Sequence, residues 1–77
     1  MIKDKISNAY HSNGKLMYEF NYKNGEYHGI QSQWYDNGQL KGQSHWKNGK
    51  IDGLYQQWYK NGQLQLKANF KDSKIDY

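Results

Sequence analysis

The sequence contains no cysteine and no proline, and lysine supplies all eleven of its cationic residues, so arginine is absent too. Without cysteine the chain can form no disulfide, no cysteine-ligated zinc site and no thiol nucleophile. Proteins that read phosphates or base edges specifically rely on the forked guanidinium of arginine. The formal net charge of +4 therefore predicts at most a weak, salt-sensitive attraction to anions and no specific nucleic-acid partner.

Long hydrophobic runs are missing as well. Mean hydropathy is −1.28, hydrophobic residues make up 35% of the chain, and residues 1–11 contain no apolar stretch. This composition predicts neither a signal peptide nor a membrane span. Together with the missing cysteines, it leads us to expect a soluble, cytoplasmic protein. A chain of 77 residues has room for one small domain with a thin core.

Aromatic residues, in contrast, make up 17% of the chain, and tyrosine and tryptophan suit the half-buried surface of a β-sheet. Asn-Gly dipeptides recur with gaps that alternate between 11 and 13 residues, which gives a period of 24. Their asparagines are Asn13, Asn24, Asn37, Asn48 and Asn61. A fixed period of this length indicates a repeat architecture. We divide the single domain, residues 1–77, into repeats at about 1–24, 25–48 and 49–72 with a stub at 73–77.

Asn-Gly is the strongest short-range sign of a β-hairpin, because both residues tolerate positive φ. The segments between these dipeptides read as short strands, and no window has the apolar spacing of a helix. The expected strands are residues 5–11, 15–22, 29–35, 39–46, 53–59 and 63–70. The sequence thus predicts an all-β fold: a single-layer antiparallel β-meander of about six strands, built from three 24-residue hairpin repeats.

The loop length decides which residues face each other. A two-residue loop at Asn37 would place Trp34 opposite Lys41 and scatter apolar residues over both faces. A three-residue loop ending at a left-handed Gly38 places Trp34 opposite Leu40 and gathers them on one face, so we prefer it. The second kind of turn, at residues 23–28 and 47–52, is expected to be longer and to end at a glycine.

The aromatic residues on this predicted face form the first candidate site. A single sheet has no second layer to cover such a face, so a partner protein, self-association or the curvature of the sheet itself must cover it. The candidate partner-binding residues are Tyr10, Tyr18, Tyr22, Trp34, Trp46, Trp58 and Phe70.

Two further surfaces are candidates. The opposite face mixes rings with amides, which suits a carbohydrate or a polar peptide but also fits the ordinary wet side of a half-buried sheet. Its residues are Gln31, Gln33, Tyr35, Tyr55, Gln57 and Tyr59. A rim of lysines at one row of turns could touch anionic lipid headgroups weakly, or could simply keep the sheet soluble. The lysine rim consists of Lys23, Lys47, Lys50, Lys71 and Lys74.

No catalytic constellation is evident. The three histidines, His11, His28 and His45, occupy different positions of the repeat, so the repeat does not bring them together as a metal site. The serines lack the context of an activated nucleophile, and the aspartates fall in or beside turns. We therefore expect neither an enzyme nor a cofactor.

The columns of glycine, aromatic and Asn-Gly residues resemble the MORN repeat in its bacterial variant. The matching stretches are Gly29 to Lys41 with Trp46 to Gly53, Gly53 to Leu66 with Phe70 to Tyr77, and a slightly degenerate first copy from Tyr10 to Gly29. Lys5 and Tyr77 stand in the glycine column of the outer copies, which indicates end caps or a trimmed array.

The resemblance implies a curved meander of hairpins with aromatic side chains stacked in rows. It also implies a scaffold or protein-binding role; membrane-lipid binding has been proposed for eukaryotic members, and some bacterial relatives resemble antitoxin or immunity partners of secreted toxins. We accordingly predict a protein-protein interaction module whose aromatic face, or open strand near residues 63–70, binds a toxin, an effector or a second copy. The alternative is a lipid surface or a carbohydrate, bound through the lysine rim or the Gln/Tyr face.

Overall fold

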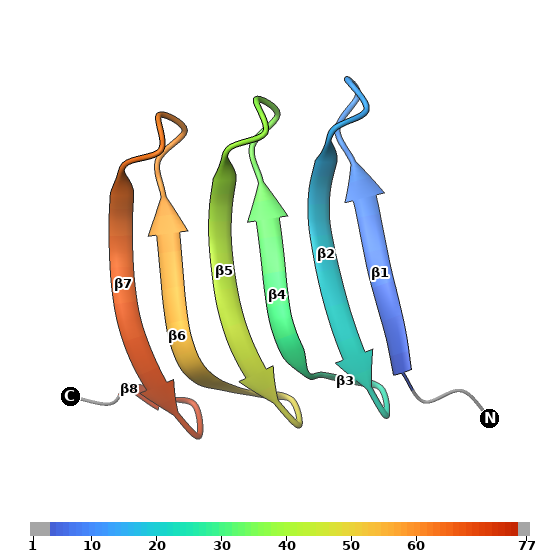
Figure 1. Ribbon diagram of the computed structural model, residues 1–77. Helices are drawn as coiled ribbons and strands as arrows, with labels where there is room; N and C mark the ends of the chain where they lie inside the picture. Colours follow the sequence, from blue (N-terminus) through green and yellow to red (C-terminus); the bar gives the residue numbers. More distant parts are fainter. Residues whose placement is uncertain (1–3, 76–77) are drawn as a thin grey trace.

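The computed structural model describes residues 4–75, which form one antiparallel β-sheet without a helix (Figure 1). The strands are β1 (Asp4–Tyr10), β2 (Leu16–Lys23), β3 (Glu26–Tyr27), β4 (Gly29–Trp34), β5 (Leu40–Lys47), β6 (Lys50–Trp58), β7 (Leu64–Lys71) and β8 (Lys74–Ile75). Their order in the sheet is β1-β2-β4-β5-β6-β7-β8, and β3 pairs with β2. The predicted β-meander is confirmed; the two-residue strands β3 and β8 are additions to the six strands expected from the sequence.

The sheet is a single layer, because the described part of the chain measures 38 × 33 × 9 Å along its principal axes. No hydrophobic side chain within residues 4–75 is buried, and the buried residues are Gln31 and Ser32, which are 5% and 6% exposed. Strand pairing and contacts along each face therefore hold the sheet together, rather than a core between layers. The same residues include no helix that is long and apolar enough to cross a membrane.

The first kind of turn closes the hairpin inside each repeat. In the middle repeat, the amide of Gly38 donates to the carbonyl of Tyr35 at 3.0 Å, and the amide of Tyr35 donates to the carbonyl of Gln39 at 2.9 Å. Gly38 has a φ of 89°, which glycine adopts without steric cost. Trp34 then pairs with Leu40. The three-residue loop and its register are confirmed.

The second kind of turn joins one repeat to the next and is tighter than predicted. Asn48 and Gly49 have φ values of 51° and 82°, the conformation of a two-residue type I′ turn. Lys47 pairs with Lys50 across it. The long loop expected at residues 47–52 is wrong because strand β6 already begins at Lys50; the loop expected at 23–28 is interrupted by β3 in the same way.

A β-bulge in each hairpin interrupts the alternation of side chains. In the middle repeat the register moves from the pair Trp34–Leu40 to the pair Gln33–Gly42, so Lys41 is an inserted residue. Equivalent shifts occur in the first and third hairpins. Because two residues of the bulged strand oppose one residue of its partner, positions beyond the bulge change face relative to strict alternation.

These bulges make the prediction of one aromatic face wrong. Residues paired directly across antiparallel strands share a face, and Trp34 pairs with Leu40 before the bulge whereas Trp46 pairs with Gly29 beyond it. One face, which we call the Trp34 face, carries Tyr10, Trp34 and Trp58. The opposite face, which we call the hollow face, carries Tyr18, Tyr22, Trp46 and Phe70.

Candidate binding site

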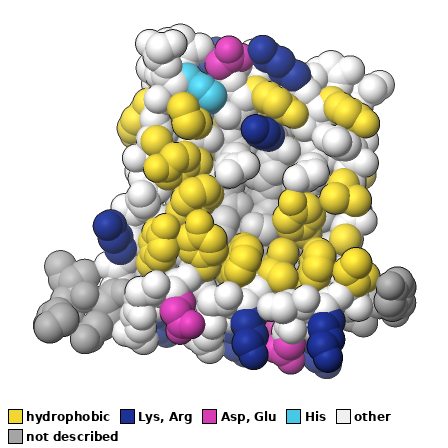
Figure 2. Space-filling view, turned by 180° about the vertical axis from the view of Figure 1, so that it is seen from behind, with side chains coloured by type: hydrophobic (Ala, Val, Ile, Leu, Met, Phe, Trp, Pro, Cys, Tyr) yellow, Lys and Arg dark blue, Asp and Glu magenta, His cyan; other side chains and the backbone are white. Residues whose placement is uncertain are grey.

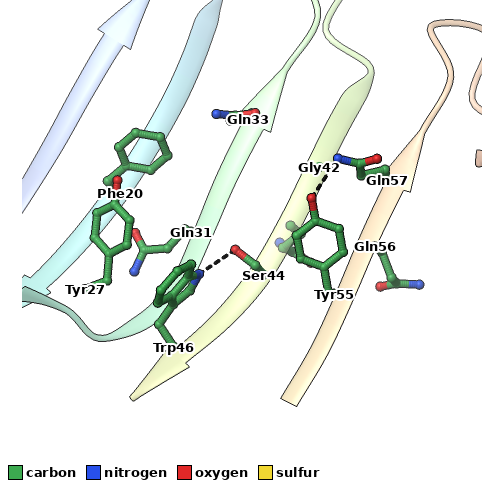
Figure 3. A pocket seen from close by; sticks show the side chains of 11 residues that line it. Phe20, Tyr27, Gln31, Gln33, Gly42, Ser44, Trp46, Tyr55, Gln56 and Gln57 are labelled. Atoms are coloured by element: carbon green, nitrogen blue, oxygen red, sulfur yellow. Dashed lines mark hydrogen bonds between the residues drawn. The ribbon is translucent and has the colours of Figure 1, made fainter. Parts of the chain in front are cut away.

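A hollow of about 190 Å³ lies on the hollow face, over the central strands β4, β5 and β6 (Figure 3). Its floor and walls include residues that the sequence analysis assigned to the Gln/Tyr face. The main lining residues are Gln31, Gln33, Gly42, Ser44, Tyr55 and Gln57. Four of the six predicted Gln/Tyr residues thus share one surface with four of the seven predicted aromatic residues.

Two small residues of the middle repeat create the hollow. Gly42 and Ser44 stand 24 positions after Tyr18 and Phe20 of the first repeat. The rings of Tyr18 and Phe20 stack with centroids 4.4 Å apart and cover the sheet there. The middle repeat lacks both rings, so its backbone is exposed as the floor of a depression.

Aromatic side chains border the hollow on the side of the first repeat. The ring of Tyr27 lies 5.6 Å from Phe20, 5.1 Å from Tyr22 and 5.1 Å from Trp46, measured between centroids. Tyr55 borders the hollow on the other side. Figure 2 shows the result as a band of hydrophobic side chains across the sheet and a column along its N-terminal strands, around a paler area.

Hydrogen bonds fix most of the polar groups at the border. The indole of Trp46 donates to Ser44 Oγ at 2.7 Å, and Gln57 Nε2 donates to the hydroxyl of Tyr55 at 2.7 Å (Figure 3). The amide of Gln33 has no side-chain partner among residues 4–75. Gln33 therefore presents both a donor and an acceptor to a ligand.

No ionisable carboxylate, lysine or histidine lines the hollow. Burial, followed by the neighbouring Tyr22, raises the pKa of Tyr27 above its ordinary value, so this phenol is neutral at physiological pH. The surface offers rings and amides without net charge, which suits neutral polar groups better than phosphates.

The Trp34 face carries the remaining predicted partner-binding residues. Its most exposed large side chains lie on the outermost strand, where Ile6 is 62% exposed and Tyr10 is 60% exposed. Gln43 on this face donates to the hydroxyl of Ser32 at 3.2 Å, so polar residues separate the apolar ones. The two faces hence differ: the hollow face has clustered rings, and the Trp34 face has spaced ones.

The lysine rim lies along the row of turns between repeats, which are two-residue turns rather than the longer loops expected. Acidic residues share this end of the sheet, since Glu26 follows the first such turn and Asp72 lies in the third. Figure 2 shows both signs of charge below the hydrophobic band. The ion pair in the described part of the chain lies at the opposite end, where Lys60 contacts Asp36 at 2.9 Å and lowers the pKa of that carboxyl.

The three histidines have structural hydrogen bonds. His11 Nε2 donates to the carbonyl of Trp34 at 2.8 Å, and His45 Nδ1 donates to the carbonyl of Leu54 at 2.9 Å. His28 Nδ1 accepts from the amide of Asn48 at 3.3 Å. Within residues 4–75, no three histidine, aspartate or glutamate side chains cluster as metal ligands would.

The pattern of the MORN repeat variant matches residues 3–24, 27–48 and 51–72. This chain belongs to the MORN repeat variant family. MORN repeats are generally associated with protein or membrane-lipid binding, and the family is a binding module rather than a known enzyme family. Comparison with curated proteins and with solved structures gave no match.

Sequence reasoning missed the hollow although the MORN periodicity contains a signal for it. Within an array, a position where a small residue interrupts a column of rings marks a depression. Gly42 and Ser44 give this signal relative to the first repeat, where Tyr18 and Phe20 occupy the same columns; the third repeat has Leu66 and Ala68 there. The signal is visible only when repeats are compared face by face, and that comparison requires the bulge to be placed correctly.

Proposed function

We propose that this chain is a protein-binding module and that its hollow face holds an extended segment of a partner protein. The observation that carries the proposal is the ring-bordered hollow, where the middle repeat has Gly42 and Ser44 at the positions of Tyr18 and Phe20 in the first repeat. The coarser family association with protein or lipid binding supports this class of function.

The chemistry of the hollow suits a polypeptide. Gln33 offers an amide that can bond to a peptide group, and the rings of Trp46 and Tyr55 can pack against its side chains. Pockets for drug-sized ligands are about 300–1,000 Å³, whereas this hollow is about 190 Å³. It therefore fits one or two side chains of a larger partner better than a whole small molecule.

Filling the hollow tests the proposal. Gly42→Tyr introduces the residue that the first repeat carries as Tyr18, and a Cβ at Gly42 would meet Gln56 O at 3.6 Å, an ordinary contact. We expect the variant to keep the circular dichroism of a β-sheet. It should lose the partners that wild-type protein captures from an extract of the cells that express it.

The matched control removes rings from the other face. The double variant Trp34→Ala and Trp58→Ala should capture the same partners as the wild type, provided that its circular dichroism is unchanged. Loss of capture in this double variant, with full capture by Gly42→Tyr, would move the binding site to the Trp34 face and overturn the proposal.

Scaffold and inhibitory roles are two forms of the same function, and we place both in the cytoplasm. If the module neutralises a toxin or an effector, the gene of that partner should lie beside the gene of this chain. An isolated gene would contradict the immunity form and leave the scaffold form.

A lipid surface is a second candidate, because the hydrophobic band lies directly beside the lysine rim (Figure 2). Lysines near an anionic membrane contribute about 1 kcal/mol each. Co-sedimentation with phosphatidylserine vesicles should then exceed that with phosphatidylcholine vesicles and fall with added salt. Equal sedimentation with both vesicle types would remove this candidate.

A further inference from the structure

Neighbouring repeats are joined by side chains as well as by strand pairing. In the first of three such contacts, Asn13 Nδ2 donates to the carbonyl of Asp36 at 2.7 Å. The equivalent Asn37 Nδ2 donates to the carbonyl of Lys60 at 3.1 Å. In both contacts the donor belongs to the earlier repeat and the carbonyl to the later one, whereas Gln31 Nε2 donates in the reverse direction to the carbonyl of Asn21 at 2.9 Å.

The second contact has the same polarity. His11 Nε2 donates to the carbonyl of Trp34 at 2.8 Å, and 24 positions later the hydroxyl of Tyr35 donates to the carbonyl of Trp58 at 2.8 Å. A histidine and a tyrosine thus make the equivalent hydrogen bond at one position of the repeat.

The third contact lies nearer the middle of the strands. Asn21 Nδ2 donates to the carbonyl of Ile30 at 2.7 Å, and the equivalent His45 Nδ1 donates to the carbonyl of Leu54 at 2.9 Å. Each of the three contacts therefore occurs twice, once at each boundary between repeats.

The two ends of the sheet carry the unmatched halves of these contacts. At the C-terminal end the equivalent donors are Tyr59, Asn61 and Asn69, and residues 4–75 provide no carbonyl of a following repeat for them. At the N-terminal end the equivalent carbonyls belong to Ile6, Tyr10 and Ser12, and no preceding repeat within residues 4–75 supplies their donors.

Exposed hydrophobic side chains concentrate at the same two ends. Ile6 and Tyr10, on β1, are 62% and 60% exposed, and Leu64 and Leu66, on β7, are 50% and 46% exposed. Among the large exposed hydrophobic residues of the described chain, Ile30 alone lies away from both ends. Each end of the sheet therefore exposes the groups that one repeat presents to its neighbour inside the chain.

We propose that copies of this chain bind head to tail, with β7 of one copy beside β1 of the next. The interface continues the boundary between repeats: Leu66 would lie opposite Ala9 of the next copy, as Gly42 lies opposite Gln57 within the chain. Tyr59 would donate to the carbonyl of Tyr10 of that copy. This surface is the edge of the sheet, so the proposal does not depend on the hollow.

A symmetric pairing of two identical ends lacks this complementarity. Two C-terminal ends would leave the donors Tyr59, Asn61 and Asn69 without the carbonyls that such donors meet at a repeat boundary, and two N-terminal ends would leave those carbonyls without donors. Head-to-tail contact leaves one open end on each side of every pair, so it extends to further copies unless the chain of copies closes. Unpaired backbone groups of the edge strands support the same arrangement.

The first arm of the test removes the C-terminal donors. Tyr59→Phe deletes a hydroxyl, and Asn61→Asp deletes an amide donor while keeping the Oδ1 that accepts from Gln63 N at 2.9 Å. Sedimentation velocity over a range of concentrations should show wild-type species larger than one copy. The double variant should associate roughly 25-fold more weakly, since each of the two lost hydrogen bonds costs about fivefold.

The matched control carries the same changes one repeat earlier. Tyr35→Phe and Asn37→Asp remove hydrogen bonds inside the chain, so they should lower stability to urea and leave association unchanged. The opposite result, in which the internal pair alone reduces association, would contradict the proposal.

The second arm distinguishes head-to-tail from symmetric pairing. Asn8→Pro blocks β1, because an edge strand tolerates proline while losing a backbone donor. Mixed with the double variant at Tyr59 and Asn61, at a concentration where neither variant associates alone, it should form a one-to-one dimer that grows no further. Tyr10→Lys serves in the same arm if the proline variant fails the circular dichroism check.

Three results would overturn the proposal: a wild-type protein that is monomeric at every concentration, a blocked variant that dimerises alone as strongly as the wild type, or a mixture that shows no heterodimer. The first result would show that the chain does not self-associate, and the second would show that it associates symmetrically. The capture of a partner by the hollow is unaffected by either outcome.

Discussion

Gln31 substitutes for backbone pairing that is missing between β2 and β4, which pair directly at only two positions. Its side-chain oxygen accepts from the amide of Asn21 at 2.6 Å, and its side-chain nitrogen donates to the carbonyl of Asn21 at 2.9 Å. One side-chain amide thus bonds to both backbone groups of Asn21, whose carbonyl also accepts from the amide of His28 at 3.0 Å. Burial to 5% exposure reflects this position between the strands.

Gln31→Ala should lower the free energy of unfolding by about 1–2 kcal/mol, because it leaves the amide of Asn21 without this partner, while the carbonyl of Asn21 still accepts from the amide of His28 at 3.0 Å. Urea denaturation followed by circular dichroism measures the change. Gln33→Ala is the control on the same strand and face, and it should change stability by less than about 0.5 kcal/mol. Equal effects of the two substitutions would show that Gln31 has no special role.

The sequence did not reveal Gln31 in this role, because nothing in the repeat marks it. Its column holds Ser7 in the first repeat and Tyr55 in the third. A periodic pattern predicts what repeats share, whereas this contact arises where β4 separates from β2 in one repeat only. Individual departures of this kind have to be measured in the structure.

At the scale of elements, the two kinds of turn and the bulge set the geometry of the sheet. The Asn-Gly dipeptides marked every turn between strands except the one at Asp72 and Ser73, which joins β7 to β8, and the preference for gathering apolar residues predicted the pair Trp34–Leu40. The inserted Lys41 escaped prediction because a bulge adds a residue without a distinctive sequence signal. That single insertion moved Trp46 to the other face, and the aromatic site had to be divided accordingly.

The third two-residue turn departs from the other two, and a substitution there should stabilise the chain. Ser73 has a φ of 71°, where Gly49 occupies the equivalent position with a φ of 82°. Ser73→Gly should raise the free energy of unfolding by about 1 kcal/mol, because glycine relieves left-handed strain. A fall in the urea midpoint of this variant would contradict the prediction.

The reverse change supplies the control for that turn. A Cβ at Gly49 would lie 2.7 Å from Glu26 Oε2 and would also occupy a left-handed conformation. Gly49→Ser should therefore lower the urea midpoint, in the opposite direction to Ser73→Gly.

The ion pair between two neighbouring turns gives the sheet a pH dependence. Lys60 lowers the pKa of Asp36 in the folded chain, chiefly by hydrogen bonding. A carboxyl with a lowered pKa stabilises the fold above its unfolded pKa of about 3.9, and this contribution disappears as pH falls through the lower folded value. Asp36→Asn should remove that part of the acid sensitivity, measured as the urea midpoint at neutral and at acidic pH.

Lys60→Gln should likewise reduce the fall of the urea midpoint between neutral and acidic pH, since it removes the cause of the lowered pKa of Asp36. Because both side chains are exposed, added salt should reduce the effect in the wild type. If Asp36→Asn keeps the full acid sensitivity of the wild type, that sensitivity arises from other titratable groups.

The whole molecule is a sheet 9 Å thick without a buried hydrophobic side chain in its described part. The slope of stability against urea concentration scales with the surface that unfolding exposes, and small proteins have values of about 1–3 kcal/mol per M. This chain hides little surface when folded. We expect a value of about 1 kcal/mol per M or less, measured at concentrations low enough for a single copy.

A slope that rises with protein concentration would indicate that association hides additional surface. A high slope at the lowest concentration would contradict the single-layer description, because it would require a covered face within one copy. The fold class was accessible from the sequence, but the distribution of side chains over two open faces depends on the bulges and was not.

Successive residues of one strand point to different sides of this sheet, and only the backbone separates the sides. Gln33 belongs to the hollow and its neighbour Trp34 to the opposite surface. One chain can therefore act as a partition between two molecules, with adjacent codons specifying contacts to different neighbours. A substitution that alters contact with one molecule therefore falls next to residues that contact the other.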